Sequence, residues 1–207
     1  MERILTAHSG SDNTVDNSPE FVEMILQSGV DAFEMDCQIS DQGELYLAHD
    51  SLQDSSKSLL LRDVFEVMLA SNNHKIKINI DCKDEKCAKL ALKMADNYSL
   101  LDRTLLSGSI NLEDIAQKDR EKIFYNLPET FPLNQTSIDL ANLTYNGIKV
   151  VQLYYGVVTQ EVLETIKAAG LELSVWTVND IQKIDQMFAM GCMNVTTRSA
   201  LAYLGNL

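Results

Sequence analysis

The sequence has few residues of several kinds, and each scarcity excludes a class of protein. It holds only four cysteines, and no two of them have the Cys-x-x-Cys spacing that is typical of redox and zinc sites. No apolar run approaches the ~20 residues that cross a bilayer. The start of the chain has no basic region followed by an apolar one, so we expect no signal peptide and a cytoplasmic protein, with export by another route left open.

Positive charge is also scarce. The chain has 17 Lys and Arg against 30 Asp and Glu, and its formal net charge is −13. This charge repels nucleic acids and anionic membrane surfaces, so we expect neither as the main partner. It would repel a phosphate substrate too, unless a metal ion and local cations reversed the field at the site. The length and composition predict one globular domain that covers residues 1–207.

Two segments alternate strictly between apolar and polar residues. Along 33–40, Phe33, Met35, Cys37 and Ile39 alternate with Glu34, Asp36, Gln38 and Ser40. Along 76–83, Ile76, Ile78, Ile80 and Cys82 alternate with Lys77, Asn79, Asp81 and Lys83. Successive side chains of a strand point to opposite faces, so each strand has one apolar face and one face with carboxylates. The apolar faces predict that Cys37 and Cys82 are buried, reduced and structural.

The polar faces have two interpretations. One is a half-exposed hairpin with a solvated acidic face, in which a turn at 41–43 leads to a second strand that ends at His49 and Asp50. The other is a closed barrel whose lumen receives the polar side chains, because parallel strands buried on both faces are usually apolar throughout. Near the open end of such a lumen, Glu34, Asp36 and Asp81 would repel one another unless a cation lay between them.

The rest of the chain alternates between short apolar strands and helical segments. We expect further strands at 4–7, 104–107, 122–126, 149–154, 172–177 and 193–196. We expect helices at 18–29, 60–70, 85–97, 137–145, 159–170 and 179–191, a weak one at 111–117, and one at the C-terminus. Asn179 is the expected cap of its helix, with Gln182 as capping-box partner. About eight strand–helix units favour an α/β fold of the (β/α)8 TIM-barrel type, of compact size.

A doubly wound open sheet is the rival fold. It is disfavoured because no glycine-rich phosphate loop follows the first strand. Active sites of (β/α)8 barrels lie at the carboxyl ends of the strands, where His8, His49 and Lys83 also fall. A histidine with satisfied hydrogen bonds at a strand end is the alternative for His8 and His49, and His74 is expected in a surface loop.

Six short motifs occur in one order along the whole chain. They are His8-Ser9-Gly10, Asp16-Asn17-Ser18, Glu34-x-Asp36, His49-Asp50, Asp81-x-Lys83 and Val175-Trp176-Thr177-Val178-Asn179. Together they resemble the glycerophosphodiester phosphodiesterases, which have His-Arg-Gly, a Pro-Glu-Asn-Thr-like loop, Glu-x-Asp, His-Asp, Glu-x-Lys and Val-Trp-Thr-Val-Asn. The resemblance implies a metal-dependent enzyme that hydrolyses glycerophosphodiesters to glycerol 3-phosphate and an alcohol.

The resemblance also implies a role for each candidate site residue. Glu34, Asp36 and Asp81 would be ligands of Mg²⁺ or Ca²⁺, His8 and His49 the acid–base pair, Lys83 a phosphate contact and Ser9 a substrate contact. Carboxylate oxygens do favour such hard cations, and histidine titrates in the range that acid–base catalysis needs. Which histidine is the acid, which metal binds, which head group is cleaved and how the chain assembles stay open.

Four departures from the family pattern bear on the substrate. Ser9 replaces an arginine that grips the phosphate, and serine cannot offer a charged bidentate fork. Asp81 replaces a glutamate, as in related sphingomyelinase-D-like phosphodiesterases. The segment between His49 and Asp81 lacks the small inserted subdomain of many members, and 196–199 reads Thr-Thr-Arg-Ser in place of Thr-Asp-Arg-Pro.

Two alternatives to glycerophosphodiester hydrolysis follow from these departures. One is a related phosphodiesterase with an altered substrate, such as a lysophospholipid. The other is a non-catalytic barrel that binds a metal or a phosphodiester. Ser9 favours both alternatives, whereas His8, His49 and Lys83 favour hydrolysis.

Overall fold

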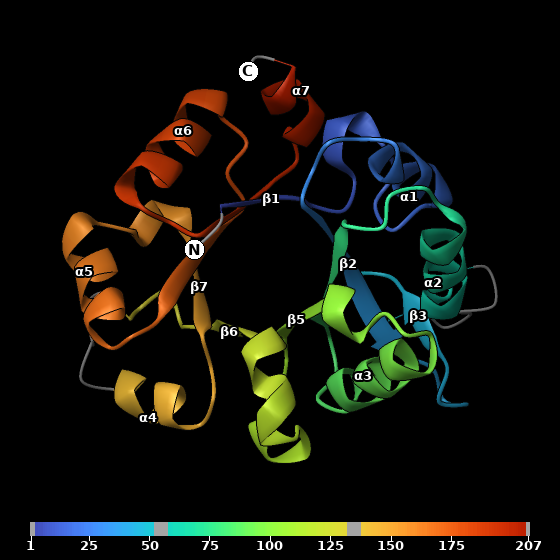
Figure 1. Ribbon diagram of the computed structural model, residues 1–207, viewed down its shortest axis with the longest axis horizontal. Helices are drawn as coiled ribbons and strands as arrows, with labels where there is room; N and C mark the ends of the chain where they lie inside the picture. Colours follow the sequence, from blue (N-terminus) through green and yellow to red (C-terminus); the bar gives the residue numbers. More distant parts are fainter. Residues whose placement is uncertain (1–2, 52–57, 132–137, 206–207) are drawn as a thin grey trace.

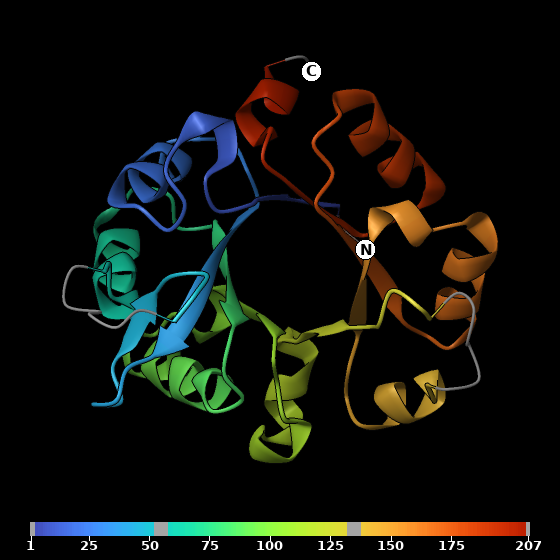
Figure 2. The same cartoon turned by 180° about the vertical axis from the view of Figure 1, so that it is seen from behind.

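The computed structural model describes residues 3–51, 58–131 and 138–205. Eight parallel strands form a nearly closed ring in the order β5-β4-β2-β1-β9-β8-β7-β6, as Figures 1 and 2 show. The strands are β1 Ile4–Ala7, β2 Ala32–Ile39, β4 Lys77–Cys82, β5 Thr104–Gly108, β6 Phe124–Asn126, β7 Val150–Tyr154, β8 Glu172–Trp176 and β9 Asn194–Thr197. A further strand, β3 Leu45–Leu47, pairs antiparallel with β2. The predicted compact (β/α)8 barrel is therefore confirmed.

Helices cover the outside of the ring (Figure 1). They are α1 Pro19–Leu26, α2 Leu61–Ala70, α3 Cys87–Asn97, α4 Leu140–Tyr145, α5 Gln160–Ala168, α6 Ile181–Met190 and α7 Ala200–Leu204. Within the described ranges, α2 is the one α-helix between β3 and β4, as expected for a barrel without the inserted subdomain. The start of the helix predicted at 137 lies outside the described residues. None of the described helices is long and apolar enough to cross a membrane.

The ring is weakest between β5 and β6. A single parallel bridge, Leu106 to Ile123, joins these neighbours in the part of the chain that the structure describes. Two 3-10 helices, η4 Leu112–Asp114 and η5 Gln117–Lys122, lie between them. The weak helix predicted at 111–117 is therefore the short 3-10 helix η4. Asn111 accepts a hydrogen bond from the Glu113 backbone N–H at 3.1 Å, which closes a tight turn in place of a regular helical turn.

Side-chain caps begin several helices. Ser18 precedes Pro19 and its hydroxyl accepts from the Phe21 N–H at 3.1 Å, which starts α1 as the sequence predicts. The predicted cap of α6 is wrong by one residue, because Asp180, and not Asn179, accepts from the Lys183 N–H at 2.9 Å. The capping box with Gln182 therefore does not form. Asn179 instead accepts a hydrogen bond from the Arg198 N–H at 2.9 Å, which ties it to the end of β9.

Burial separates the two faces of β2 and β4 as the alternation predicts. Phe33, Met35, Ile78 and Ile80 have no exposed surface and belong to the main apolar core. All four cysteines are free and buried, which confirms the prediction for Cys37 and Cys82. The opposite faces bring polar side chains into the lumen, where apolar packing does not compensate for their lost hydration. Those side chains form the candidate site.

Candidate active site

Three carboxylates converge where β2 and β4 run side by side. The parallel register pairs Glu34 with Asn79 and Asp36 with Asp81, so the polar residues of both strands lie at matching heights. One oxygen each of Glu34, Asp36 and Asp81 lies within 4.8 Å of the other two. Glu34 and Asp36 are only 5% and 3% exposed. The predicted carboxylate cluster is present, and it could hold a metal ion.

Ionisation of Glu34 is electrostatically unfavourable in this cluster. Burial raises its pKa well above the ordinary value, and the negative charges of Asp36 and Asp81 raise it further. The backbone N–H of Ser9 donates to Glu34 Oε2 at 3.1 Å and partly offsets these effects. A cation at this place would stabilise the ionised form of Glu34.

Lys83 pairs with the two aspartates. Its Nζ lies 2.7 Å from Asp36 Oδ1, and it also contacts Asp81 Oδ2. Burial lowers the pKa of Lys83, but attraction to Asp81 and Asp36 outweighs burial and raises it overall. The ammonium therefore compensates charge within the cluster, and its predicted contact with a phosphate stays a prediction.

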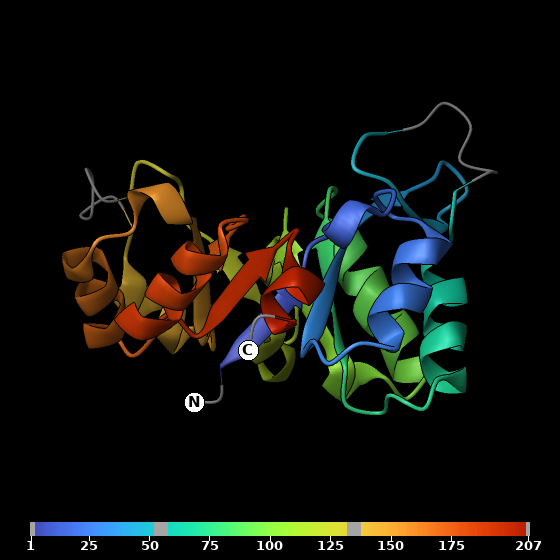
Figure 3. The same cartoon turned by 90° about the horizontal axis from the view of Figure 1, so that it is seen from above.

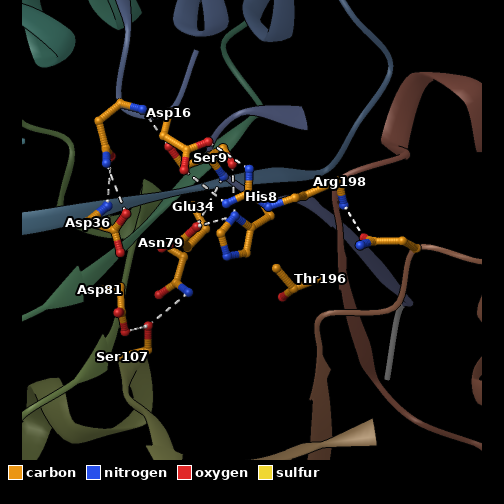
Figure 4. A network of polar contacts seen from close by, with 12 residues as sticks. His8, Ser9, Asp16, Glu34, Asp36, Asn79, Asp81, Ser107, Thr196 and Arg198 are labelled. Atoms are coloured by element: carbon orange, nitrogen blue, oxygen red, sulfur yellow. Dashed lines mark hydrogen bonds and ion pairs between the residues drawn. The ribbon is translucent and has the colours of Figure 1, made fainter. Parts of the chain in front are cut away.

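Ser9 supports the residues around the carboxylate cluster through hydrogen bonds. Its side chain is fully buried and accepts a hydrogen bond from the Asn17 N–H at 2.6 Å. Asn17 has a φ of 55°, a left-handed conformation that asparagine tolerates better than most residues. In this conformation Asn17 also reaches Asp36, because its Nδ2 donates to Asp36 Oδ2 at 2.9 Å. Figure 4 shows Ser9, Glu34 and Asp36 in this polar network. The predicted contact between Ser9 and a substrate stays a prediction.

His8 lies at the end of β1, beside Glu34. Its Nδ1 lies 2.8 Å from the Ser9 carbonyl oxygen and 3.6 Å from Glu34 Oε2. A carbonyl oxygen can only accept, so Nδ1 carries the hydrogen in the neutral ring and Nε2 keeps a free lone pair. Burial lowers the pKa of His8, and the positive charge of Arg198 lowers it as well. His8 is therefore neutral near pH 7 and can accept a proton.

His49 follows β3 in the chain. Figure 3 shows the stretch around β3 (cyan) on the upper side of the ring, where the loop after β1 (blue) also lies. Its side chain is 69% exposed, and Nδ1 lies 2.9 Å from Asp50 Oδ1. The pKa of Asp16 is lowered chiefly by hydrogen bonds from Arg198, with a smaller contribution from His49. No hydrogen bond or ion pair joins His8 to His49, both of which are described, so their action as a pair stays a prediction.

Asn79 is a site residue to which the sequence assigned no role. Its Nδ2 donates to Ser107 Oγ at 3.1 Å, and that hydroxyl donates to Asp81 Oδ1 at 2.8 Å. Its Oδ1 is buried without a hydrogen-bond partner among the described residues. Figure 4 shows Asn79 close to Glu34, with Asp81 on one side and His8 on the other. Its place on the polar face of the 76–83 strand was the signal available in the sequence.

Arg198 is a second such residue. It follows β9, and its Nη1 and Nη2 lie 2.6 Å and 3.0 Å from the two oxygens of Asp16. Figure 4 shows the side chain reaching from the end of β9 toward His8 and Asp16. The sequence marked this arginine only as part of the altered motif at 196–199.

By sequence, no family model matches the chain, and no curated protein matches it. Solved structures do. A provisionally assigned glycerophosphoryl diester phosphodiesterase from Agrobacterium tumefaciens has a TM-score of 0.82 and 13% identity, over 100% of this chain and 97% of that one. The glycerophosphodiester phosphodiesterase of Thermotoga maritima has a TM-score of 0.77 and 17% identity, over 100% and 99%. This chain has the glycerophosphodiester phosphodiesterase fold.

A third similar structure holds a ligand. It is a phosphodiesterase of Oleispira antarctica in complex with the product sn-glycerol-3-phosphate, with a TM-score of 0.73 and 16% identity over 99% of this chain and 96% of that one. The fold that the six motifs implied is therefore confirmed along the whole length. At these identities the likeness concerns the fold, and the chemistry depends on the residues of this chain.

Proposed function

We propose that the protein is a metal-dependent phosphodiesterase that hydrolyses glycerophosphodiesters to sn-glycerol 3-phosphate and an alcohol. The observation that carries the proposal is the convergence of Glu34, Asp36 and Asp81 beside His8 at the mouth of this barrel. The Oleispira antarctica phosphodiesterase, with the product sn-glycerol-3-phosphate bound, supports the substrate class.

The donor atoms of the cluster fit a hard divalent cation. Three carboxylates and the unpaired Oδ1 of Asn79 offer oxygen ligands in the lumen, as Mg²⁺ and Ca²⁺ prefer. The four cysteines, which would suit softer metals, are buried in the apolar core. Bound there, the cation would polarise the phosphoryl group and stabilise the charge that develops on its oxygens.

The histidines would move the protons. His8 is neutral near pH 7 and has Nε2 free, so it is suited to take a proton from the attacking nucleophile. His49 lies at the exposed rim, hydrogen-bonded to Asp50, and would return a proton to the leaving alcohol. Lys83 adds positive charge at the edge of the cluster and would contact a phosphate oxygen, while Ser9 orients Glu34 through its N–H. Ser9 would therefore act on the substrate indirectly, through the carboxylate of Glu34.

One observation favours the altered-substrate alternative. Tyr154 and Trp176 are register partners at the ends of β7 and β8, with ring centroids 6.0 Å apart. Val175 packs in the core between strands and helices, so the alternation turns Trp176 toward the lumen. Figure 1 places β7 across the ring from β2. An aromatic wall there would suit a diester with a larger apolar alcohol, such as a lysophospholipid.

A substrate screen tests the proposal. Glycerophosphocholine, glycerophosphoethanolamine and lysophosphatidylcholine are incubated with the protein and Mg²⁺, Ca²⁺ or Mn²⁺, with and without chelator. We expect metal-dependent release of glycerol 3-phosphate from the first two. Faster turnover of lysophosphatidylcholine would favour the altered substrate. No turnover of any diester, with metal binding confirmed by calorimetry, would favour the interpretation as a non-catalytic barrel that binds a metal or a phosphodiester.

A further inference from the structure

Position 9 supplies no cation to a bound phosphate. Ser9 is fully buried, and its hydroxyl is engaged by the Asn17 N–H. Lys83 is paired with Asp36 and Asp81, and the charge of Arg198 acts on Glu34 and Asp36. In a protein with a net charge of −13, a dianionic product needs a further local cation.

We propose that Arg198 binds the phosphate group of the substrate and supplies the guanidinium that position 9 lacks. This inference rests on the proposed function, since it names the residue that recognises the phosphate in the same site. Arg198 follows β9, whereas the arginine of the family motif follows β1, at the position of Ser9.

The guanidinium of Arg198 is held ready for such a contact. Asp16 binds it through both oxygens at 2.6 Å and 3.0 Å, and the Arg198 N–H donates to Asn179 Oδ1 at 2.9 Å. A side chain fixed in this way loses little conformational entropy when it binds a ligand. The bonds to Asp16 use only part of its N–H groups, and the others have no partner among the described residues. The side chain is 37% exposed, so a ligand can reach it.

Gly10 shows how closely this ion pair approaches the turn that carries His8. Gly10 has a φ of 74°, and a Cβ there would lie 1.8 Å from Asp16 Oδ1 and 2.6 Å from Arg198 Nη1. The bare backbone of Gly10 therefore leaves the space that the pair fills. The positive charge of Arg198 acts from this place on His8, and also on Glu34 and Asp36.

A purely structural role would make Arg198 a tie between the first and last loops. Other contacts already join these loops. The two oxygens of Asp12 accept from the backbone N–H groups of Leu201 and Ala202 at 3.0 Å and 3.1 Å. The His8 N–H donates to the Thr197 carbonyl at 2.8 Å. The guanidinium is therefore not needed to hold the loops together, which favours a role in binding.

The test measures binding of sn-glycerol 3-phosphate by calorimetry to the wild type, Arg198→Gln and Arg198→Lys. We expect Arg198→Gln to weaken binding about 10- to 100-fold, as for loss of a charge-assisted hydrogen bond. Arg198→Lys should lose less, because it keeps the charge without the fork. Metal affinity and thermal midpoint should change little. Arg62→Gln is the matched control, since Arg62 forms an exposed ion pair with Glu44 at 3.0 Å and contacts none of the carboxylates of the cluster.

Each outcome decides between the two proposals. Unchanged affinity in Arg198→Gln, with the wild type hydrolysing diesters, would overturn the role of Arg198 and leave the proposed function standing. If the wild type binds glycerol 3-phosphate without hydrolysis and Arg198→Gln loses it, Arg198 keeps its role and the enzyme proposal fails. No binding to the wild type at all would overturn the assignment of Arg198. Should Arg198→Gln fold poorly, Asp16→Asn is the second variant. It keeps the Arg198 guanidinium but removes the carboxylate that holds it in place, and we expect a several-fold loss of affinity for glycerol 3-phosphate.

Discussion

Asn17 and Asp36 hold each other through two reciprocal hydrogen bonds. Asn17 Nδ2 donates to Asp36 Oδ2 at 2.9 Å, and the Asp36 N–H donates to Asn17 Oδ1 at 3.0 Å. Both residues are buried. The loop after β1 therefore sets the orientation of a carboxylate on β2, although Asn17 itself is not among the residues of the carboxylate cluster.

We predict that Asn17→Ala weakens divalent-metal binding about 10- to 100-fold, as loss of a partner that orients a ligand does. Calorimetry with Mg²⁺, Ca²⁺ and Mn²⁺ measures the change. Asn97→Ala, at the exposed end of α3, is the control and should bind as the wild type does. Unchanged affinity in Asn17→Ala would show that Asp36 keeps its orientation without this partner.

Glu34→Gln should abolish metal binding and stabilise the metal-free protein near pH 7. The raised pKa of Glu34 means that the folded state binds a proton more tightly than the unfolded chain does. The stability that this bound proton contributes is full below pH 4.5, the ordinary pKa of a glutamate. It is lost as pH rises through the raised pKa of Glu34. Glutamine stays neutral and avoids this loss. Thermal unfolding in chelator gives the comparison, with Glu161→Gln on exposed α5 as control. A lower midpoint with metal binding retained would rule out the site.

His8→Ala should lower turnover by about 10²–10⁴, because a general base is removed. The lowered pKa of His8 also predicts that the acid-side midpoint of the kcat/KM profile of the wild type lies below pH 6.5. His49→Ala should lose turnover on the same scale, and metal affinity should survive in both. His74, which is exposed in the turn before β4 as predicted, provides the control His74→Ala. Near wild-type rates in either variant, with chemistry rate-limiting, would remove that histidine from the mechanism.

Lys83→Met should raise the KM for a diester while leaving metal affinity the same or tighter. The ammonium offsets charge on Asp36 and Asp81, so its loss makes the cluster more attractive to a cation but less so to a phosphate. Steady-state kinetics at saturating metal gives the KM, and calorimetry gives the metal affinity. Lys89→Met is the control, because Lys89 pairs with Asp114 on the surface. Loss of metal binding without any change in KM would contradict the assignment.

The carboxylate cluster could be predicted because it depends on regular geometry. A period of two fixes which side chains of β2 and β4 share a face, and parallel neighbours in a barrel bring those faces to one lumen. Glu34, Asp36 and Asp81 therefore follow from the pattern alone. The six motifs pointed to the barrel fold of one family, and the likeness to solved structures confirms that fold.

The contacts made by loops could not be predicted in this way. Arg198 and Asp16 are 182 positions apart in the sequence, and no periodic pattern in either segment indicates that their side chains form an ion pair. Asn17 depends on one left-handed backbone conformation. Asn179 and Asp180 are both good N-caps by residue type. Asp180 caps α6, whereas the side chain of Asn179 accepts a hydrogen bond from the Arg198 N–H instead. Tertiary contacts decided each of these cases.

Phosphorus NMR of glycerophosphocholine, incubated with the protein and its preferred metal, tests the central claim most directly. The account predicts that the diester signal is replaced by that of glycerol 3-phosphate, and that chelator or Asp81→Asn stops the conversion, whereas the exposed control Asp96→Asn does not. Conversion at the wild-type rate by Asp81→Asn, or no conversion by a wild type shown to bind the metal, would contradict it.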